Sequence, residues 1–157
     1  MKKNNNEIET VFATFHDGGI TEWKGDLRQL TLKIECQYLA QEFQDAFEYF
    51  FITITNIEQI ALEPWMNPGK LEREKITELK DIFKAELEIG GAETKNGVVT
   101  INCNQHDTQF DYCGGKLFLK AENIEIKNQL KQKILPKDLY KASENYWNKF
   151  SEKTGSK

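Results

Sequence analysis

Alternation of apolar and polar side chains between Leu30 and Tyr38 constrains the fold of this chain more than any other feature. Leu, Leu, Ile, Cys and Tyr occupy every second position, with Thr, Lys, Glu and Gln between them. Because successive side chains of a β-strand point to opposite faces, this pattern predicts a strand with one buried face. The run from Phe47 to Thr55 also alternates, and its aromatic and β-branched residues indicate that both faces are partly covered.

Turn residues join other alternating runs into hairpins. Asn96-Gly97 lies between two such runs, and both residues tolerate the positive φ of a type I′ turn. A further strand pair is expected over 109–121 and 123–127. Apolar positions change parity between these two runs, which predicts a bulge or a turn near Asn123.

The sequence DGG at 17–19 supplies a second turn. The residues before it, 11–16, are rich in β formers, and a strand over 20–27 follows. We therefore expect a first hairpin here.

Two segments have helical spacing. Apolar residues between Leu71 and Phe83 fall near helical spacing among many charges, which predicts a short amphipathic helix, with a strand from Ile76 as the alternative. Pro136 suits a first helical turn, and an apolar stripe continues from there to Phe150. This last segment is expected to be a helix that packs on a sheet.

Length and element order favour one α+β domain that is mainly β. A chain of 157 residues leaves little room for a second core, and 39% hydrophobic residues suffice for folding without disulfides. Strands in series followed by one helix predict an antiparallel sheet, rolled or partly closed into a barrel, with the C-terminal helix packed on it. A single domain is expected over 1–157, with frayed ends at about 1–9 and 151–157.

The N-terminus, the cysteines and the charge favour a cytoplasmic protein. MKKNNNEIET lacks the apolar stretch of a secretory signal, no apolar run approaches the roughly 20 residues of a bilayer span, and the three cysteines show no paired pattern. A formal net charge of −4 disfavours binding to nucleic acid or anionic lipid. We expect neither nucleic acid nor membrane as a partner, and a basic protein suits the acidic middle of the chain better. The oligomeric state is left open.

Cys103, His106 and Cys113, with His16 or Cys36 as a fourth ligand, are the residues that best fit a metal site. Thiolate and imidazole are the ligands that zinc prefers, but structural zinc ligands usually occur as closely spaced pairs. Each of these cysteines instead shares the strand parity of its apolar neighbours, as buried cysteines do. The preferred interpretation is three core cysteines and no cofactor.

No motif in the chain predicts an enzyme. The pairs His16-Asp17 and His106-Asp107 could serve acid–base chemistry only if the fold brought them together. Sequences of the nucleophile type, GxSxG or SxxK, and glycine-rich nucleotide loops do not occur.

Binding to another protein therefore ranks above catalysis. Trp23 and Trp65 lie near charged or turn sequences, where an exposed aromatic side chain can anchor a partner. With Asp17 they form the candidate partner-binding set.

Three segments, FHDGGITEW, LTLKIECQYL and FEYFFITITNIEQIALEPW, resemble small uncharacterised bacterial proteins, some of which are similar to immunity proteins of polymorphic toxin systems. The resemblance ends at Trp65 and carries no catalytic residue. It implies a cytoplasmic, non-enzymatic protein that covers the active site of a toxin domain, such as a basic nuclease. The alternative is a small β-barrel-like protein that binds a ligand or metal, with possible enzymatic activity, through a polar pocket near His16, His106, Cys103 or Asp107.

Overall fold

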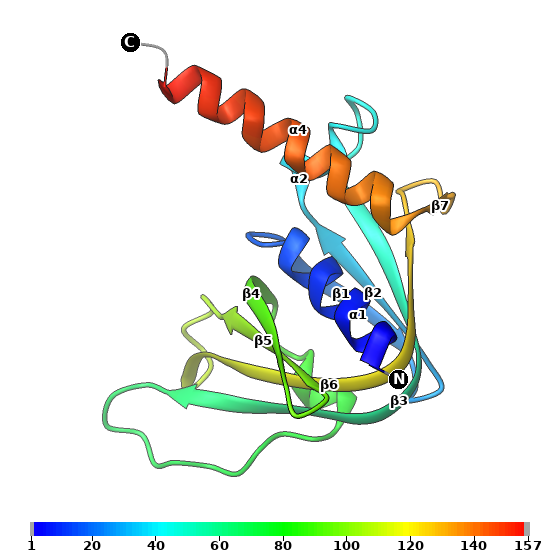
Figure 1. The fold of residues 1–157 in the computed structure, drawn as a ribbon. Coiled ribbons are helices and arrows are strands. Elements are labelled where there is room, and N and C mark those ends of the chain that lie inside the picture. The colour runs from blue at the N-terminus through cyan, green and yellow to red at the C-terminus, as the bar shows by residue number, and fades with distance from the viewer. Residues whose placement is uncertain (1, 156–157) are drawn as a thin grey trace.

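The computed structural model describes residues 2–155, and the side chains of residues 6–152. Helices and strands follow one another in a mixed order, with one helix before the first strand and one after the last (Figure 1). They are α1 (Lys2–Thr14), β1 (Gly19–Gly25), β2 (Gln29–Glu35), α2 (Gln37–Ala40), β3 (Tyr49–Met66), α3 (Leu79–Ile82), β4 (Leu87–Lys95), β5 (Val98–Asn104), β6 (Tyr112–Lys127), β7 (Lys133–Ile134) and α4 (Pro136–Gly155).

The sheet closes on itself. All pairings are antiparallel, in the order β3-β2-β1-β4-β5-β6, and β3 also pairs with β6, which completes a ring. β7 is added outside the ring, on β6. The shortest pairing within the ring joins β1 to β4 through only Gly19 with Glu88 and Ile20 with Leu87. The expected mainly β fold with a barrel-like antiparallel sheet is confirmed, and the β1–β4 junction is its narrowest link.

The long strands β3 and β6 lie side by side and bend together (Figure 1). Asn56 has a positive φ of 52°, and the register between the two strands shifts between Ile57 and Gln59. The buried positions of β6 change parity between Ala121 and Ile124. The predicted irregularity near Asn123 is therefore confirmed, but it bends one continuous strand and does not separate two. Because of this bend, β3 pairs with β2 through its first part, and β6 pairs with β5 through its first part, while the two strands pair with each other.

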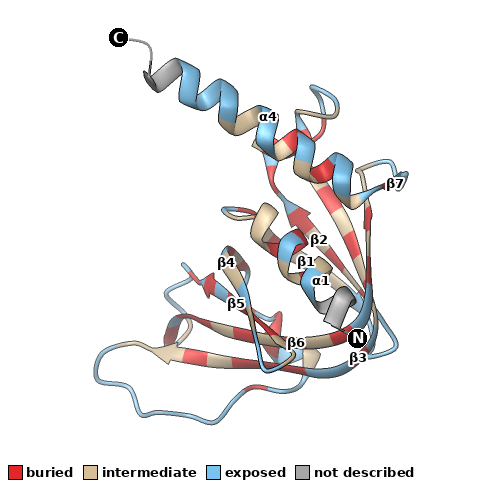
Figure 2. Ribbon diagram, in the orientation of Figure 1, coloured by how far each residue is buried: buried red, intermediate tan, exposed pale blue. Residues whose placement is uncertain are grey.

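The segment 11–16 was expected to be a strand, and that expectation is wrong. It belongs to α1 and the turn after it, and α1 lies in the concave side of the bent strands (Figure 1). Ile8, Val11, Phe12 and Phe15 are all 0% exposed, and their spacing is that of one helical stripe (Figure 2). The β-forming residues of 11–16 are helical because this stripe, which starts at Ile8, fills the space that the bent sheet encloses.

The hairpin at Asn96-Gly97 is confirmed. Both residues have positive φ, 53° and 78°, and Lys95 pairs with Val98 across the turn from β4 to β5.

The helix expected between Leu71 and Phe83 is confined to α3. Residues 67–75 form an exposed loop without a helix or strand, and Ile76 makes a single antiparallel bridge to Leu62. Of the apolar residues whose spacing predicted a longer helix, only Leu79 and Ile82 lie in α3.

The C-terminal helix is confirmed as α4. Leu139 and Ala142, in its first half, are buried in the same hydrophobic cluster as the sheet and α1. Its C-terminal end extends beyond the body of the molecule (Figures 1 and 2). Residues 2–9 are helical in α1 and 151–155 in α4, whereas positions 1 and 156–157 of the expected frayed ends lie outside the described residues.

No helix in the described part of the chain is both long enough and apolar enough to cross a bilayer.

Replacement of Gly114 by alanine is expected to destabilise the fold by at least about 2 kcal/mol. Gly114 has a φ of +151°, and a Cβ there would clash with the carbonyl oxygen of Cys103 on β5. Gly91→Ala is the matched control, because a Cβ at Gly91 meets nothing within 4 Å. Urea unfolding of both variants measures the difference, and equal stabilities would contradict this account of the β5–β6 contact.

Candidate functional site

Aromatic side chains gather where the second half of α4 passes the ends of α1 and α2. His16 stacks on Trp147 with ring centroids 5.2 Å apart and planes 14° apart. The ring centroids of Tyr38 and Tyr146 are 4.6 Å apart, and those of Phe150 and Trp147 are 5.5 Å apart. These residues, His16, Tyr38, Tyr146, Trp147 and Phe150, are called the aromatic cluster below. Phe150 is 47% exposed, and Tyr146 and Trp147 are half-buried, so the cluster presents ring surface to solvent.

Hydrogen bonds fix the base of the aromatic cluster. The hydroxyl of Tyr38 donates to the carbonyl oxygen of His16 at 2.8 Å. Asp17 follows with a positive φ of 69°, and its backbone N–H donates to the carbonyl oxygen of Ile89 on β4 at 2.7 Å. The carboxylate of Asp17 lies 3.2 Å from Nδ1 of His16. The ring of His16 is therefore held between α4 and the start of β4.

An ion pair also attaches this part of α4 to the segment after α2. Nζ of Lys149 lies 3.1 Å from Oε1 of Glu42, which follows α2, and the Glu42 side chain is only 14% exposed. The second half of α4 is thus attached both by rings and by charge.

The ionisable groups under the cluster are suited to structure and not to nucleophilic attack. Burial is the main cause that raises the pKa of the Tyr38 hydroxyl far above its ordinary value, with Cys36 contributing. Burial also raises the pKa of the Cys36 thiol to about 11. Both groups stay protonated at neutral pH, so neither supplies a thiolate or a phenolate.

Of the predicted partner-binding residues, only Asp17 lies beside the aromatic cluster. Its side chain is 66% exposed. Trp23 is half-buried on β1, with its ring 6.3 Å from that of Phe83. Trp65 is half-buried near the end of β3, where its ring covers Gly114. The two tryptophans belong to other parts of the surface.

The candidate zinc ligands lie in different surroundings. Cys103 is buried, donates weakly to the carbonyl oxygen of Ile101 at 3.7 Å, and has a pKa raised by burial to about 12. His106 is exposed and lies 3.2 Å from Oε1 of Glu88, while His16 belongs to the aromatic cluster. Over the residues whose side chains are described, no three His, Cys, Asp or Glu side chains gather as a metal site.

Cys113 does not share the buried parity that its apolar neighbours predicted, and that interpretation is wrong. It is exposed, and its Sγ donates to the carbonyl oxygen of Trp65 at 3.6 Å. The positive φ of Gly114 and a register shift between Pro64 and Met66 interrupt the alternation at this end of β6. Tyr112 is buried in its place.

A hollow of about 440 Å³ lies beside the β1–β4 junction. Its lining has three carboxylates and one lysine, and consists of Gly19, Lys84, Ala85, Glu86, Leu87, Glu88, Gln105, His106 and Asp107. We call it the acidic hollow. The buried side chain of Gln105 orders its rim by donating to the carbonyl oxygens of Tyr112 at 2.7 Å and Asp107 at 2.9 Å.

The two His-Asp pairs therefore belong to separate places. His106 and Asp107 line the acidic hollow, whereas His16 and Asp17 border the aromatic cluster. The turn at 17–19 connects these places, because Asp17 touches His16 and Gly19 lines the hollow.

No family model, curated protein or solved structure matches this chain. The chemistry of the aromatic cluster and the acidic hollow therefore rests on their own geometry.

Sequence patterns located part of the aromatic cluster but not its assembly. Tyr146, Trp147 and Phe150 fall on the predicted apolar stripe of the last helix. His16 and Tyr38 join them only through the tertiary fold, and no sequence signal links positions so far apart.

In the native state, one thiol is expected to react with a disulfide reagent such as DTNB. Cys113 is exposed, whereas Cys36 and Cys103 are buried and have raised pKa values. The absorbance of released thionitrobenzoate counts the reactive thiols before and after denaturation. Cys113→Ser is the control, and rapid reaction of this variant in its native state would contradict the burial of the other two.

Tyr38→Phe is expected to destabilise the protein by about 1 kcal/mol, because it removes the bond to the His16 carbonyl. The unfolded hydroxyl loses its proton near pH 10 while the folded one keeps it, so this tyrosine makes stability fall as pH rises above about 10. Urea unfolding across that range should show a weaker decline in the variant. Tyr49→Phe, on the outward face of β3, is the control, and an equal effect there would contradict the role of Tyr38.

Proposed function

We propose that this chain is a cytoplasmic, non-enzymatic protein-binding module of immunity type, which docks a basic protein through the aromatic cluster and the acidic hollow. The observation that carries the proposal is the aromatic cluster, whose rings are fixed against one another while part of their surface remains exposed.

Such rings are suited to anchoring a partner. Tryptophan and tyrosine are enriched among the residues that dominate binding energy at protein interfaces. Because Trp147 is stacked on His16 and Tyr146 packs against Tyr38, little side-chain freedom is left to lose on association. Since α4 extends beyond the body at this point, Phe150 can enter a groove on another protein (Figure 1).

The charge next to these anchors favours a basic partner. Asp17 is mostly exposed beside the aromatic cluster, and Glu86, Glu88 and Asp107 line the hollow. A lysine or arginine side chain that entered the hollow would meet acceptors on several sides. Complementary charge of this kind accelerates association and excludes acidic proteins.

The interior offers less to a catalytic role. The space inside the ring is occupied by fully buried apolar side chains of α1 and the turn after it, including Phe12 and Phe15. Among the described buried residues, the polar groups are the side chains of Thr100 and Gln105, the hydroxyl of Tyr112 and the thiols of Cys36 and Cys103, and Gln105 orders a loop. Polar groups available to a partner are therefore on the outside.

The double variant Trp147→Ala, Phe150→Ala is expected to weaken partner binding by about 2 kcal/mol or more for each anchor that is buried in the complex. The protein should be purified gently from its host, and native mass spectrometry then compares the amount of co-purifying polypeptide. Phe150→Ala alone is a second variant, because it leaves the stacking of Trp147 on His16 intact. Leu71→Ala, 89% exposed on the loop after β3, is the matched control.

The identified polypeptide then tests the immunity type. Expressed alone it should arrest growth, and co-expression of this chain, but not of the double variant, should restore growth. Purification as a bare chain, or binding equal in the double variant and the Leu71→Ala control, would contradict the proposal.

A further inference from the structure

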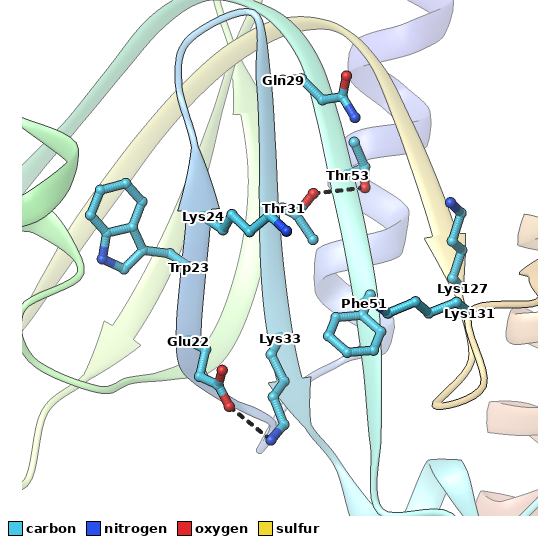
Figure 3. A pocket seen from close by; sticks show the side chains of 10 residues that line it. All are labelled: Glu22, Trp23, Lys24, Gln29, Thr31, Lys33, Phe51, Thr53, Lys127 and Lys131. Atoms are coloured by element: carbon cyan, nitrogen blue, oxygen red, sulfur yellow. Dashed lines mark hydrogen bonds and ion pairs between the residues drawn. The ribbon is translucent and has the colours of Figure 1, made fainter.

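A groove of about 280 Å³ crosses the outward face of β1, β2 and β3 and reaches the turn between β6 and β7 (Figure 3). Four lysines and only one acidic residue line it, although the chain as a whole carries a net charge of −4. We call it the lysine groove. Its lining consists of Glu22, Trp23, Lys24, Gln29, Thr31, Lys33, Phe51, Thr53, Lys127 and Lys131.

Strand register builds the lysine groove from two rows of outward side chains. One row runs from Lys24 through Thr31 and Thr53 to Glu125, which lies beyond the lining, and the other contains Glu22, Lys33, Phe51 and Lys127. The hydroxyls of Thr31 and Thr53 meet at 3.1 Å on the floor, as Figure 3 shows. The groove therefore lies on rigid paired strands.

Two of the lysines are neutralised and two are available. Nζ of Lys33 lies 3.0 Å from Glu22, and the hydrogen bond between them raises the pKa of the lysine. Lys127 lies 4.0 Å from Glu125. Within the described residues, Lys24 and Lys131 make no ion pair within 4.0 Å.

A strained turn positions Lys131, one of the two available lysines. Lys131 has a positive φ of 65°, a conformation that costs a side-chain-bearing residue roughly 1 kcal/mol. Asn128 holds the turn by accepting bonds from the backbone N–H of Leu130 at 2.9 Å and of Gln132 at 3.0 Å. The result is that Nζ of Lys131 lies 5.6 Å from the ring centre of Phe51, at the groove.

We propose that the lysine groove binds a small organic phosphate monoester that carries a flat ring, with its phosphate held by Lys24 and Lys131 and its ring against Phe51. A phosphate monoester has a charge of about −1.5 to −2 at neutral pH, which two unpaired ammonium groups match. The threonine hydroxyls on the floor add neutral hydrogen-bonding groups. The volume is near the lower end of the range for ligand pockets, about 300 Å³, so a small molecule fits better than a polymer.

Three probes distinguish the contribution of the ligand's phosphate from that of its ring. Calorimetry should compare phenyl phosphate, inorganic phosphate and benzyl alcohol, with the shifted amide signals of Thr31, Phe51 and Thr53 locating the site. Phenyl phosphate is expected to bind most tightly. Phe51→Leu should weaken phenyl phosphate but leave inorganic phosphate unchanged.

Charge-matched variants decide the role of the lysines. Lys24→Gln with Lys131→Gln should weaken phenyl phosphate at least about tenfold, because a hydrogen bond to a charged group is worth more than about 1.4 kcal/mol. Lys137→Gln with Lys141→Gln, exposed on α4, changes the net charge equally and should have no effect. The proposal would be overturned if both double variants lost the same affinity for phenyl phosphate, or if the protein did not bind phenyl phosphate at all. It would also be overturned if inorganic phosphate bound as tightly as phenyl phosphate, or if a single-stranded oligonucleotide bound more tightly.

Discussion

The structure depends on the burial of one face of α1 inside the bent ring of strands. Four side chains of this helix and of the turn that ends it lose all contact with solvent: Ile8, Val11, Phe12 and Phe15. Full burial of a side chain of this size contributes about 1.5–3 kcal/mol, so these four together contribute roughly 6–12 kcal/mol to the core. The ring can enclose a helix only because β3 and β6 bend together, at Asn56 in one strand and between Ala121 and Ile124 in the other.

The surface features follow from that central contact. The chain leaves α1 through His16 and Asp17, and the backbone N–H of Asp17 attaches it at once to Ile89 on β4. Gly18 is needed here because a Cβ would lie 2.8 Å from the carbonyl oxygen of Phe15. The same turn brings His16 under Trp147 and places Gly19 beside the acidic hollow. The positions of the aromatic cluster and of the hollow therefore both depend on the turn that anchors the end of α1 to β4.

Local pattern was a reliable guide where neighbours in sequence are also neighbours in space. The alternation after Leu30 and the Asn96-Gly97 turn each report a contact made within one strand or one hairpin, and both were predicted from sequence. Residues 11–16 were mistaken for a strand because the window was short and the stripe that defines the helix begins earlier, at Ile8. Cys113 was placed on the wrong face because strand parity cannot be continued across Gly114, whose φ is +151°.

The sequence by itself determined a mainly β domain with a terminal helix, because strand and helix periods, turn residues and the apolar stripe of α4 are local properties of the chain. The tertiary structure alone decided that the sheet closes, that α1 fills it, and which chemical groups meet on the surface. Closure depends on a junction of only two residue pairs between β1 and β4, and the aromatic cluster joins His16 to Trp147. Such contacts between distant segments depend on how the whole core packs, and no local pattern encodes them.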